Sequence, residues 1–193
     1  MTIRPGVVWG SRFAGPEPDE VHDDPAVARH LATAATEPVW VRGGDLHRSL
    51  GAPDRAEDRM GYPVDLGFVR LDGGPELPFA AHVVARRRGW RGRFVVVLNA
   101  AFVGEWHVGP RAHPNDGRLD VIDGQLRLRQ ALAVRRRLAT GSHLPHPGLV
   151  TSSVRSGSWS FDRPTNVLID GRRAGSARVL DVRIVPDAGL IVA

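Results

Sequence analysis

Two Asp-Gly pairs are the residues of this sequence whose type and position most clearly suggest chemistry. Asp116-Gly117 lies between a proline-rich stretch and an apolar Leu-Asp-Val, and Asp170-Gly171 follows the apolar run Asn-Val-Leu-Ile. Glycine adopts positive φ freely and an Asp side chain bonds its own backbone, so both pairs predict tight turns. Asp116 can alternatively supply a carboxylate to a hard cation. Asp170, at a strand end, can alternatively act as a general base that deprotonates a hydroxyl.

Two other groups of residues are candidates for binding an anion. Gly43, Gly44 and Asp45 lie between a short apolar run and a helix-like segment, and successive amides at a helix start can hold a phosphate. Arg172 and Arg173 follow the second Asp-Gly pair, and their guanidinium groups are suited to a phosphate or a phospholipid head group. Gly-Gly-Asp is also common in ordinary loops, so this segment alone does not define a site.

The composition excludes several classes of enzyme and metal site. All 26 basic residues are arginine, so a Walker A loop, a Schiff-base lysine and a Ser-Lys hydrolase are ruled out. The absence of cysteine rules out disulfides, thiolate nucleophiles and zinc sites with cysteine ligands. His143 and His146 lack an obvious third ligand, which favours a loop with solvated histidines over a zinc site. The net charge of +5 favours anionic partners.

Strand-like patterns dominate the sequence from residue 62 onward. Long apolar runs alternate with connections rich in glycine and charge, such as residues 86–93, and this pattern predicts hairpins. Residues 125–140 carry apolar side chains near a 3.6-residue period and predict one crossing helix. We therefore predict an α+β chain, mainly β, with an antiparallel β-sandwich over residues 62–193. Residues 1–61 predict a short α/β remnant packed against it, with Asp24 as the N-cap of a helix.

Several segments form an ordered series along the chain. RGGDLHRSLGAP is followed by PVDLGFVRLDG, then by VVVLNAAFVGEWHVGPRAHPNDGRLDVI, and last by NVLIDGRRAGSARVLDVRIVPDAGLIV. This series resembles the C-terminal domain of the bacterial diacylglycerol kinases and related lipid kinases, a family that includes the sphingosine kinases, over about residues 38–193. The resemblance implies that Asp170 is the general base and that Asp116 belongs to a metal-associated turn that binds Mg²⁺.

Two departures from the family pattern affect the expected activity. The family's Gly-Gly-Asp-Gly-Thr segment, which belongs to its ATP-binding domain, does not occur in these 193 residues. Phosphoryl transfer depends on positioning ATP and its metal, so we do not expect ATP to bind to the isolated chain. The family's Asp-Gly-Glu reads Asp170-Gly171-Arg172 here, which reverses the local charge and should lower the basicity of Asp170.

The leading functional prediction is a non-catalytic, lipid-kinase-like module that binds an anionic lipid or a phosphorylated small molecule. The alternative is the acceptor-binding half of a split lipid kinase, which would phosphorylate a lipid hydroxyl with ATP held by a separate kinase-domain partner. The sequence leaves open whether the chain forms a homodimer. Nucleic-acid binding is the least favoured class, because the arginine clusters have no aromatic residues interleaved for base stacking.

The predicted location is the cytoplasm, with peripheral association at a membrane surface as the alternative. No stretch approaches the roughly 18 uninterrupted apolar residues of a membrane span. The first residues also lack the apolar segment of a secretory signal.

Overall fold

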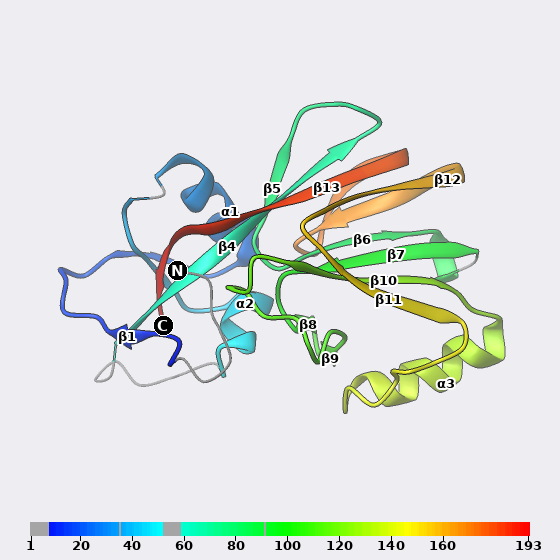
Figure 1. Ribbon diagram of the computed structural model, residues 1–193, viewed down its shortest axis with the longest axis horizontal. Coiled ribbons are helices and arrows are strands. Elements are labelled where there is room, and N and C mark those ends of the chain that lie inside the picture. The colour runs from blue at the N-terminus through cyan, green and yellow to red at the C-terminus, as the bar shows by residue number, and fades with distance from the viewer. Residues whose placement is uncertain (1–7, 35, 52–58, 91) are drawn as a thin grey trace.

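A computed structural model describes residues 8–34, 36–51, 59–90 and 92–193. Figure 1 shows two layers of strands on one side of the molecule and a small α/β unit on the other. The elements are, in chain order, β1 Ser11–Arg12, β2 Asp19–Val21, α1 Asp24–Thr33, β3 Val39–Val41, α2 Gly44–Ser49, β4 Met60–Leu71, β5 Leu77–Phe79, β6 His82–Arg86, the 3-10 turn Arg88–Trp90, β7 Arg93–Leu98, β8 Phe102–Val103, β9 Trp106–His107, β10 Leu119–Gln125, α3 Leu128–Leu138, β11 Leu149–Val154, β12 Ser156–Ile169 and β13 Arg172–Val192. The prediction of an α+β chain that is mainly β is therefore confirmed.

The large sheet curls so that its two halves face each other. Its main path is β1-β4-β13-β12-β6-β7-β10-β11, and every pairing along this path is antiparallel. One core cluster joins residues of β4, β5, β12 and β13 to residues of β6, β7 and β10, so these two groups of strands pack face to face. This arrangement is the antiparallel sandwich that the sequence predicts.

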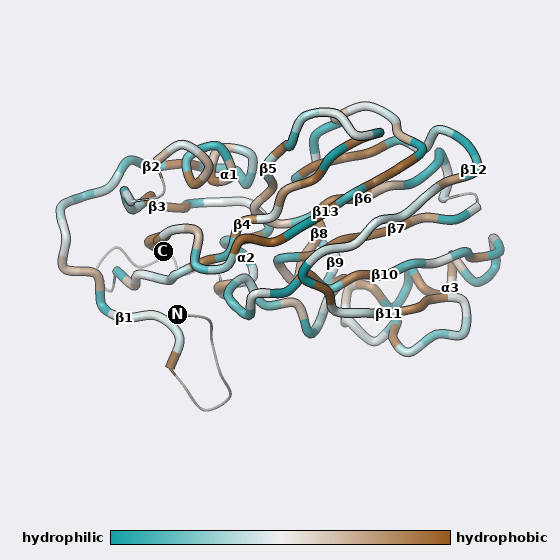
Figure 2. Tube along the Cα trace, turned by 45° about the horizontal axis from the view of Figure 1, so that its top comes forward, coloured by the Kyte–Doolittle hydropathy of each residue, from teal (hydrophilic) through white to brown (hydrophobic). Residues whose placement is uncertain are grey.

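The lower layer of the sandwich consists of β6, β7, β10 and β11, and within it β6 and β7 are apolar on both faces. In β7, Val95 and Val97 point into the core between the layers, whereas Phe94, Val96 and Leu98 belong to a second core on the side of α3. Successive side chains of a strand point to opposite faces, so an uninterrupted apolar run indicates a strand that is covered on both sides. In Figure 2 the same strand is coloured mostly as hydrophobic, with hydrophilic colour at the end where it begins with Arg93.

The crossing helix is shorter than the sequence predicts. Residues 125–140 are predicted to be helical, but α3 spans Leu128–Leu138, because Gln125 still pairs with Arg93 as the last residue of β10. Val134 is buried on the sheet side of α3. None of the helices in the described part of the chain is long and apolar enough to cross a bilayer.

The N-terminal α/β unit shares its sheet with the sandwich. β3 pairs in parallel with β2 on one side and with the end of β13 on the other. The predicted boundary between residues 61 and 62 lies inside β4, which runs from this unit into the sandwich. The predicted N-cap of α1 was wrong by one residue, because the side chain of Asp23, and not that of Asp24, accepts the amide of Ala26.

Candidate functional site

Asp170 and Gly171 form the tight turn that joins β12 to β13. Both residues have positive φ, 45° for Asp170 and 76° for Gly171, as in the two-residue turns that match the twist of a hairpin. The turn interpretation of this Asp-Gly pair is therefore confirmed. The turn lies against β6, because the amide of Asp170 donates to the carbonyl oxygen of His82 at 2.9 Å.

The carboxylate of Asp170 is buried and binds the backbone amides of the residues that lead into β6. Its Oδ2 accepts the amide of Ala80 at 2.8 Å, and its Oδ1 accepts the amides of Ala81 and His82, each at 2.9 Å. Burial raises the pKa of Asp170, and the amides and the ring of His82 offset part of that rise. Asp170 therefore has a structural role that the sequence does not show, and its role as a general base stays a prediction.

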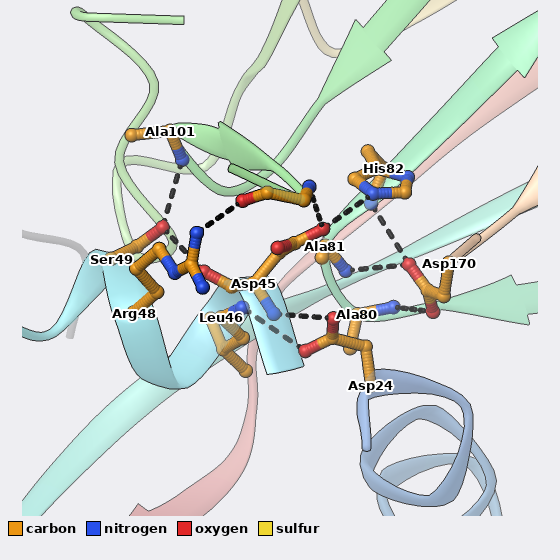
Figure 3. A network of polar contacts seen from close by, with 11 residues as sticks. Asp24, Asp45, Leu46, Arg48, Ser49, Ala80, Ala81, His82, Ala101 and Asp170 are labelled. Atoms are coloured by element: carbon orange, nitrogen blue, oxygen red, sulfur yellow. Dashed lines mark hydrogen bonds and ion pairs between the residues drawn. The ribbon is translucent and has the colours of Figure 1, made fainter. Parts of the chain in front are cut away.

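The glycine pair at the start of α2 faces a carboxylate of the same chain. Asp24 accepts the amide of Asp45 at 2.7 Å through Oδ2 and the amide of Leu46 at 3.0 Å through Oδ1. A Cβ atom on Gly44 would lie 2.4 Å from Oδ1 of Asp24, so only glycine permits this approach. At the predicted phosphate contact, Gly43 to Asp45, the amides of the helix start are therefore occupied by the side-chain carboxyl group of Asp24 (Figure 3).

The raised pKa of Asp24 should make the protein less stable as the pH rises from about 4 to about 7. Burial and the nearby Asp170 raise the pKa of Asp24 from 3.8 to about 7, so between these values the folded chain keeps a proton that the unfolded chain releases. Stability falls with rising pH wherever the folded state binds more protons. We expect the free energy of unfolding of the wild type, relative to Asp24→Asn, to fall by about 2–3 kcal/mol between pH 5 and pH 8.

Urea unfolding of both proteins at pH 5 and pH 8 measures this difference. A wild-type protein that gained stability over the same interval, relative to Asp24→Asn, would show that Asp24 is ionised in the folded state throughout.

Asp45 and His82 form a pair next to this helix start. Oδ2 of Asp45 lies 2.8 Å from Nε2 of His82 and also accepts the amide of Gly104 at 2.9 Å. Burial alone would raise the pKa of Asp45 and lower that of His82, but their contact reverses both shifts, so the pKa of Asp45 is lowered and that of His82 is raised. The pair is therefore favoured in its charged form, with only 2% of the His82 side chain exposed.

Four segments that are distant in the sequence thus meet at one cluster. Asp24 comes from α1, Asp45 from α2, His82 from β6 and Asp170 from the β12–β13 turn, and Figure 3 shows their side chains pointing toward one another. Of the predicted site residues, Asp45 and Asp170 are brought together here, since Asp45 contacts the ring of His82 and Asp170 its amide.

The two predicted phosphate ligands, Arg172 and Arg173, are not brought together. Arg172 donates to Oδ2 of Asp23 at 2.6 Å and so joins the β12–β13 turn to the N-cap of α1. Arg173 is the next residue of the same strand, so its side chain leaves from the opposite face. The expectation that Arg172 lowers the basicity of Asp170 is therefore wrong. The guanidinium group of Arg172 pairs with Asp23, and burial raises the pKa of Asp170.

The predicted turn around Asp116 holds a carboxylate from β4. Asp65, which is 1% exposed, accepts the amide of Gly117 at 2.7 Å through its Oδ2. Asp116 itself accepts the amide of Arg118 at 2.9 Å, two residues along the chain, which is the local bond that an Asp-Gly turn predicts. The turn therefore fastens β4 to the start of β10.

Asp116 does not lie in a group of metal ligands that this chain completes alone. Burial, with the neighbouring carboxylates of Asp120 and Asp65, raises the pKa of Asp116 to about 6. Within residues 8–34, 36–51, 59–90 and 92–193, no three His, Asp or Glu side chains gather so as to hold a metal ion. The residues present therefore do not form a cage for Mg²⁺, and Asp116 as its ligand stays a prediction.

A cavity of about 390 Å³ lies between the lower layer of the sandwich and α3. Its lining is mostly apolar and comes from β6, β7, β10, α3 and the segments around them. The apolar lining residues are Val84, Trp90, Phe94, Val96, Val103, Trp106, Val108, Ile122, Leu126, Ala131, Leu132, Val134, Leu138, Leu149 and Leu168. His82 and Gly171 also line the cavity, so it reaches the polar cluster described above.

Sequence reasoning missed His82, Asp65 and the cavity. His82 follows an apolar run and carries no motif, and its partners Asp45 and Asp170 are 37 and 88 residues away. Asp65 lies within the quoted segment PVDLGFVRLDG, where an acidic residue inside an otherwise apolar strand is a signal of a buried polar contact. The cavity depends on the distance between α3 and the sheet, which no local pattern encodes.

Comparison with family models places most of the chain in a known family. The model described as the YegS C-terminal NAD kinase beta sandwich-like domain matches residues 69–193. No curated protein matches the sequence.

Two solved structures from Bacillus anthracis str. Sterne have a similar fold. One is provisionally assigned as a diacylglycerol kinase, is 12% identical and has a TM-score of 0.62, and the match covers 83% of this chain and 71% of that one. The other is described as a diacylglycerol kinase, is also 12% identical and has a TM-score of 0.56, with coverage of 83% and 68%. At this identity the similarity shows the fold.

Proposed function

The chain belongs to the family of the YegS C-terminal NAD kinase beta sandwich-like domain, and from that premise we propose that it is a lipid-binding module without phosphoryl-transfer activity of its own. The hydrocarbon chain of the ligand occupies the cavity beneath α3. Its polar group lies at the end of the cavity where His82 and Gly171 meet the cluster of carboxylates.

The cavity is the observation that carries this proposal. Its volume of about 390 Å³ lies within the range of roughly 300–1,000 Å³ that is usual for small-molecule sites. Fifteen apolar residues line it, and transfer of a hydrocarbon chain from water into such surroundings is favourable. A phosphorylated ligand without a chain would gain little from this lining, so we favour a lipid.

Polar groups at one end of the cavity give the ligand an orientation. Nδ1 of His82 is buried without a hydrogen-bond partner in the described residues, and its other ring nitrogen contacts Asp45. A buried polar atom gains from a partner, so a hydroxyl or ester group of the ligand is expected to pair with Nδ1.

Two contacts support a role that does not include catalysis. The amides at the start of α2 are occupied by Asp24, which is an internal substitute for a phosphate. Both oxygens of Asp170 accept backbone amides. Because phosphoryl transfer depends on positioned phosphates and a free base, we expect no lipid phosphorylation when the purified protein is given ATP, Mg²⁺ and diacylglycerol. Measurable turnover would refute this part of the proposal.

The second candidate function is the acceptor half of a split lipid kinase. It is favoured by the position of Asp170, which precedes Gly171 in the chain and accepts the amide of His82, two residues that line the cavity. In that case a separate polypeptide carrying Gly-Gly-Asp-Gly-Thr should co-purify with the chain and restore activity. Asp170→Asn should then abolish the restored activity, whereas a reconstituted enzyme that tolerates this change would exclude Asp170 as the base.

Filling the cavity should prevent lipid binding. Ala131 of α3 lines the cavity, so Ala131→Trp places an indole where the hydrocarbon chain is expected. Ala133, two residues along the same helix, is exposed and does not line the cavity, so Ala133→Trp is the matched control. We expect the affinity for dioctanoylglycerol, measured by calorimetry, to fall at least about tenfold for the first variant, which corresponds to about 1.4 kcal/mol.

The control should bind as the wild type does. Equal affinity of the wild type and Ala131→Trp, with α3 still formed, would show that the ligand binds elsewhere. No binding of dioctanoylglycerol to the wild type would refute the proposed function itself.

A further inference from the structure

α3 and the segments that flank it carry a single sign of charge. Between Asp123 and Asp162 the sequence contains no acidic residue but six arginines. These are Arg127, Arg129, Arg135, Arg136, Arg137 and Arg155, and all six are exposed. Figure 1 places α3 at the lower edge of the molecule, on the opposite side of the sandwich from β12 and β13. The surface around α3 is therefore strongly basic.

Apolar side chains emerge within this basic surface at the edge of the cavity. Leu132 lines the cavity and is also 52% exposed, so it lies at the cavity mouth. Trp90 and Trp106 line the cavity and are only partly buried. The colouring of Figure 2 shows hydrophobic and hydrophilic residues alternating along α3.

Arginines cover both tryptophans at this rim. The guanidinium group of Arg135 lies 5.6 Å from the ring centre of Trp106, and that of Arg86 lies 5.0 Å from the ring centre of Trp90. Tryptophan and arginine are both suited to the boundary between lipid head groups and hydrocarbon, because each has an apolar part and a polar part. The rim thus combines partly exposed apolar side chains with positive charge.

We propose that the mouth of the cavity, formed by α3 with Trp90 and Trp106, docks on an anionic membrane surface. The arginines of α3 contact lipid head groups, while Leu132 and the tryptophans insert at the interface. A lipid can then pass from the bilayer into the cavity without crossing water. This inference rests on the proposed lipid-binding function and adds the surface through which the lipid is acquired.

A bilayer fits this surface better than a nucleic acid does. Phosphates attract the arginines in either case, but a nucleic-acid backbone offers no partner for Leu132 or for the apolar lining behind it. The rings of Trp90 and Trp106 are covered by arginines and line the cavity, so they do not form a platform for stacked bases.

Co-sedimentation with vesicles tests the docking surface directly. The wild type should bind vesicles of equal parts phosphatidylglycerol and phosphatidylcholine, and should bind pure phosphatidylcholine much more weakly. The triple variant Arg129→Glu, Arg136→Glu, Arg137→Glu leaves the cavity lining unchanged. It should weaken partition onto anionic vesicles at least about a hundredfold, since each basic residue near the surface contributes about 1 kcal/mol, or about fivefold.

A variant with the same change in net charge provides the control. Arg12, Arg29 and Arg163 are exposed residues outside α3 and the cavity lining, and their triple change to Glu should alter partition much less. Circular dichroism of both variants checks that the helices are retained. Leu132→Asn, which leaves the charge unchanged, should weaken partition several-fold.

The binding of soluble dioctanoylglycerol separates the two proposals. If the wild type binds it but does not prefer anionic vesicles, the docking inference is refuted and the lipid-binding function stands. Equal losses of partition in both triple variants, or binding to a DNA duplex in preference to anionic vesicles, would also refute the docking surface. If neither the soluble lipid nor vesicles bind, the proposed function fails as well.

Discussion

Replacing Asp170 with alanine should lower the free energy of unfolding by about 4 kcal/mol, because three buried amides lose their common acceptor. The amides of Ala80, Ala81 and His82 have no room to turn toward solvent where the chain enters β6. Asp170→Asn keeps one acceptor oxygen and tolerates the left-handed backbone, so its cost should be about half as large. Urea unfolding monitored by tryptophan fluorescence measures both values.

Asp72 provides a matched control for this prediction. It also has a left-handed backbone, with φ of 51°, and its Oδ1 accepts the amides of Arg178 and Val179, each at 2.8 Å. Asp72 is exposed, so water can replace its carboxylate, and Asp72→Ala should cost only about 1 kcal/mol. If Asp170→Ala and Asp72→Ala lowered the free energy of unfolding equally, burial of the amides would not be the main cause of the loss. The comparison also matters for catalysis, because a loss of activity in Asp170→Ala would follow from lost stability alone.

Replacing Gly67 with alanine should destabilise the centre of the sandwich by about 3 kcal/mol. A Cβ atom on Gly67 in β4 would lie 2.1 Å from Cζ of Phe79 and 2.4 Å from its Cε1. Phe79 is fully buried between the layers, so its ring cannot move away without displacing the surrounding core. Thermal or urea unfolding of Gly67→Ala measures the cost.

A double-mutant cycle with Phe79→Leu identifies the contact responsible. Leucine is shorter than phenylalanine and leaves space for the new methyl group. The cost of Gly67→Ala should therefore be smaller by about 1–2 kcal/mol in the Phe79→Leu background. Additive costs would show that the glycine is needed for another reason, such as the strand backbone itself.

The general fold was predictable because its signals are local. The Asp-Gly pair at residues 170–171 predicts a turn through positive φ, and the structure has one there. The separation of β6 from β7 follows from the glycines and charges of residues 86–93. The apolar period of residues 125–140 identifies α3, although its first residues remain in β10, because strand pairing with β7 competes with the helix.

The polar cluster was not predictable in the same way, because it depends on long-range packing. Asp24 is read from the sequence as the N-cap of its own helix, but one residue's difference moves that role to Asp23 and directs Asp24 to the start of α2. Arg172 stands where the family pattern has Glu, and its partner Asp23 lies 149 residues away. The sequence therefore contains no sign that Arg172 pairs with Asp23. These contacts arise only once the topology of the sheet brings the four segments together.

The length of β13 has a consequence for how the protein is made. This strand continues for 21 residues from the sandwich into the N-terminal unit, where Ile191 and Val192 pair with β3. During synthesis, α1, β3 and α2 leave the ribosome long before the strand that completes their sheet. The N-terminal unit therefore completes its sheet only after β13 has emerged from the ribosome, and until then its apolar surfaces are open to chaperones.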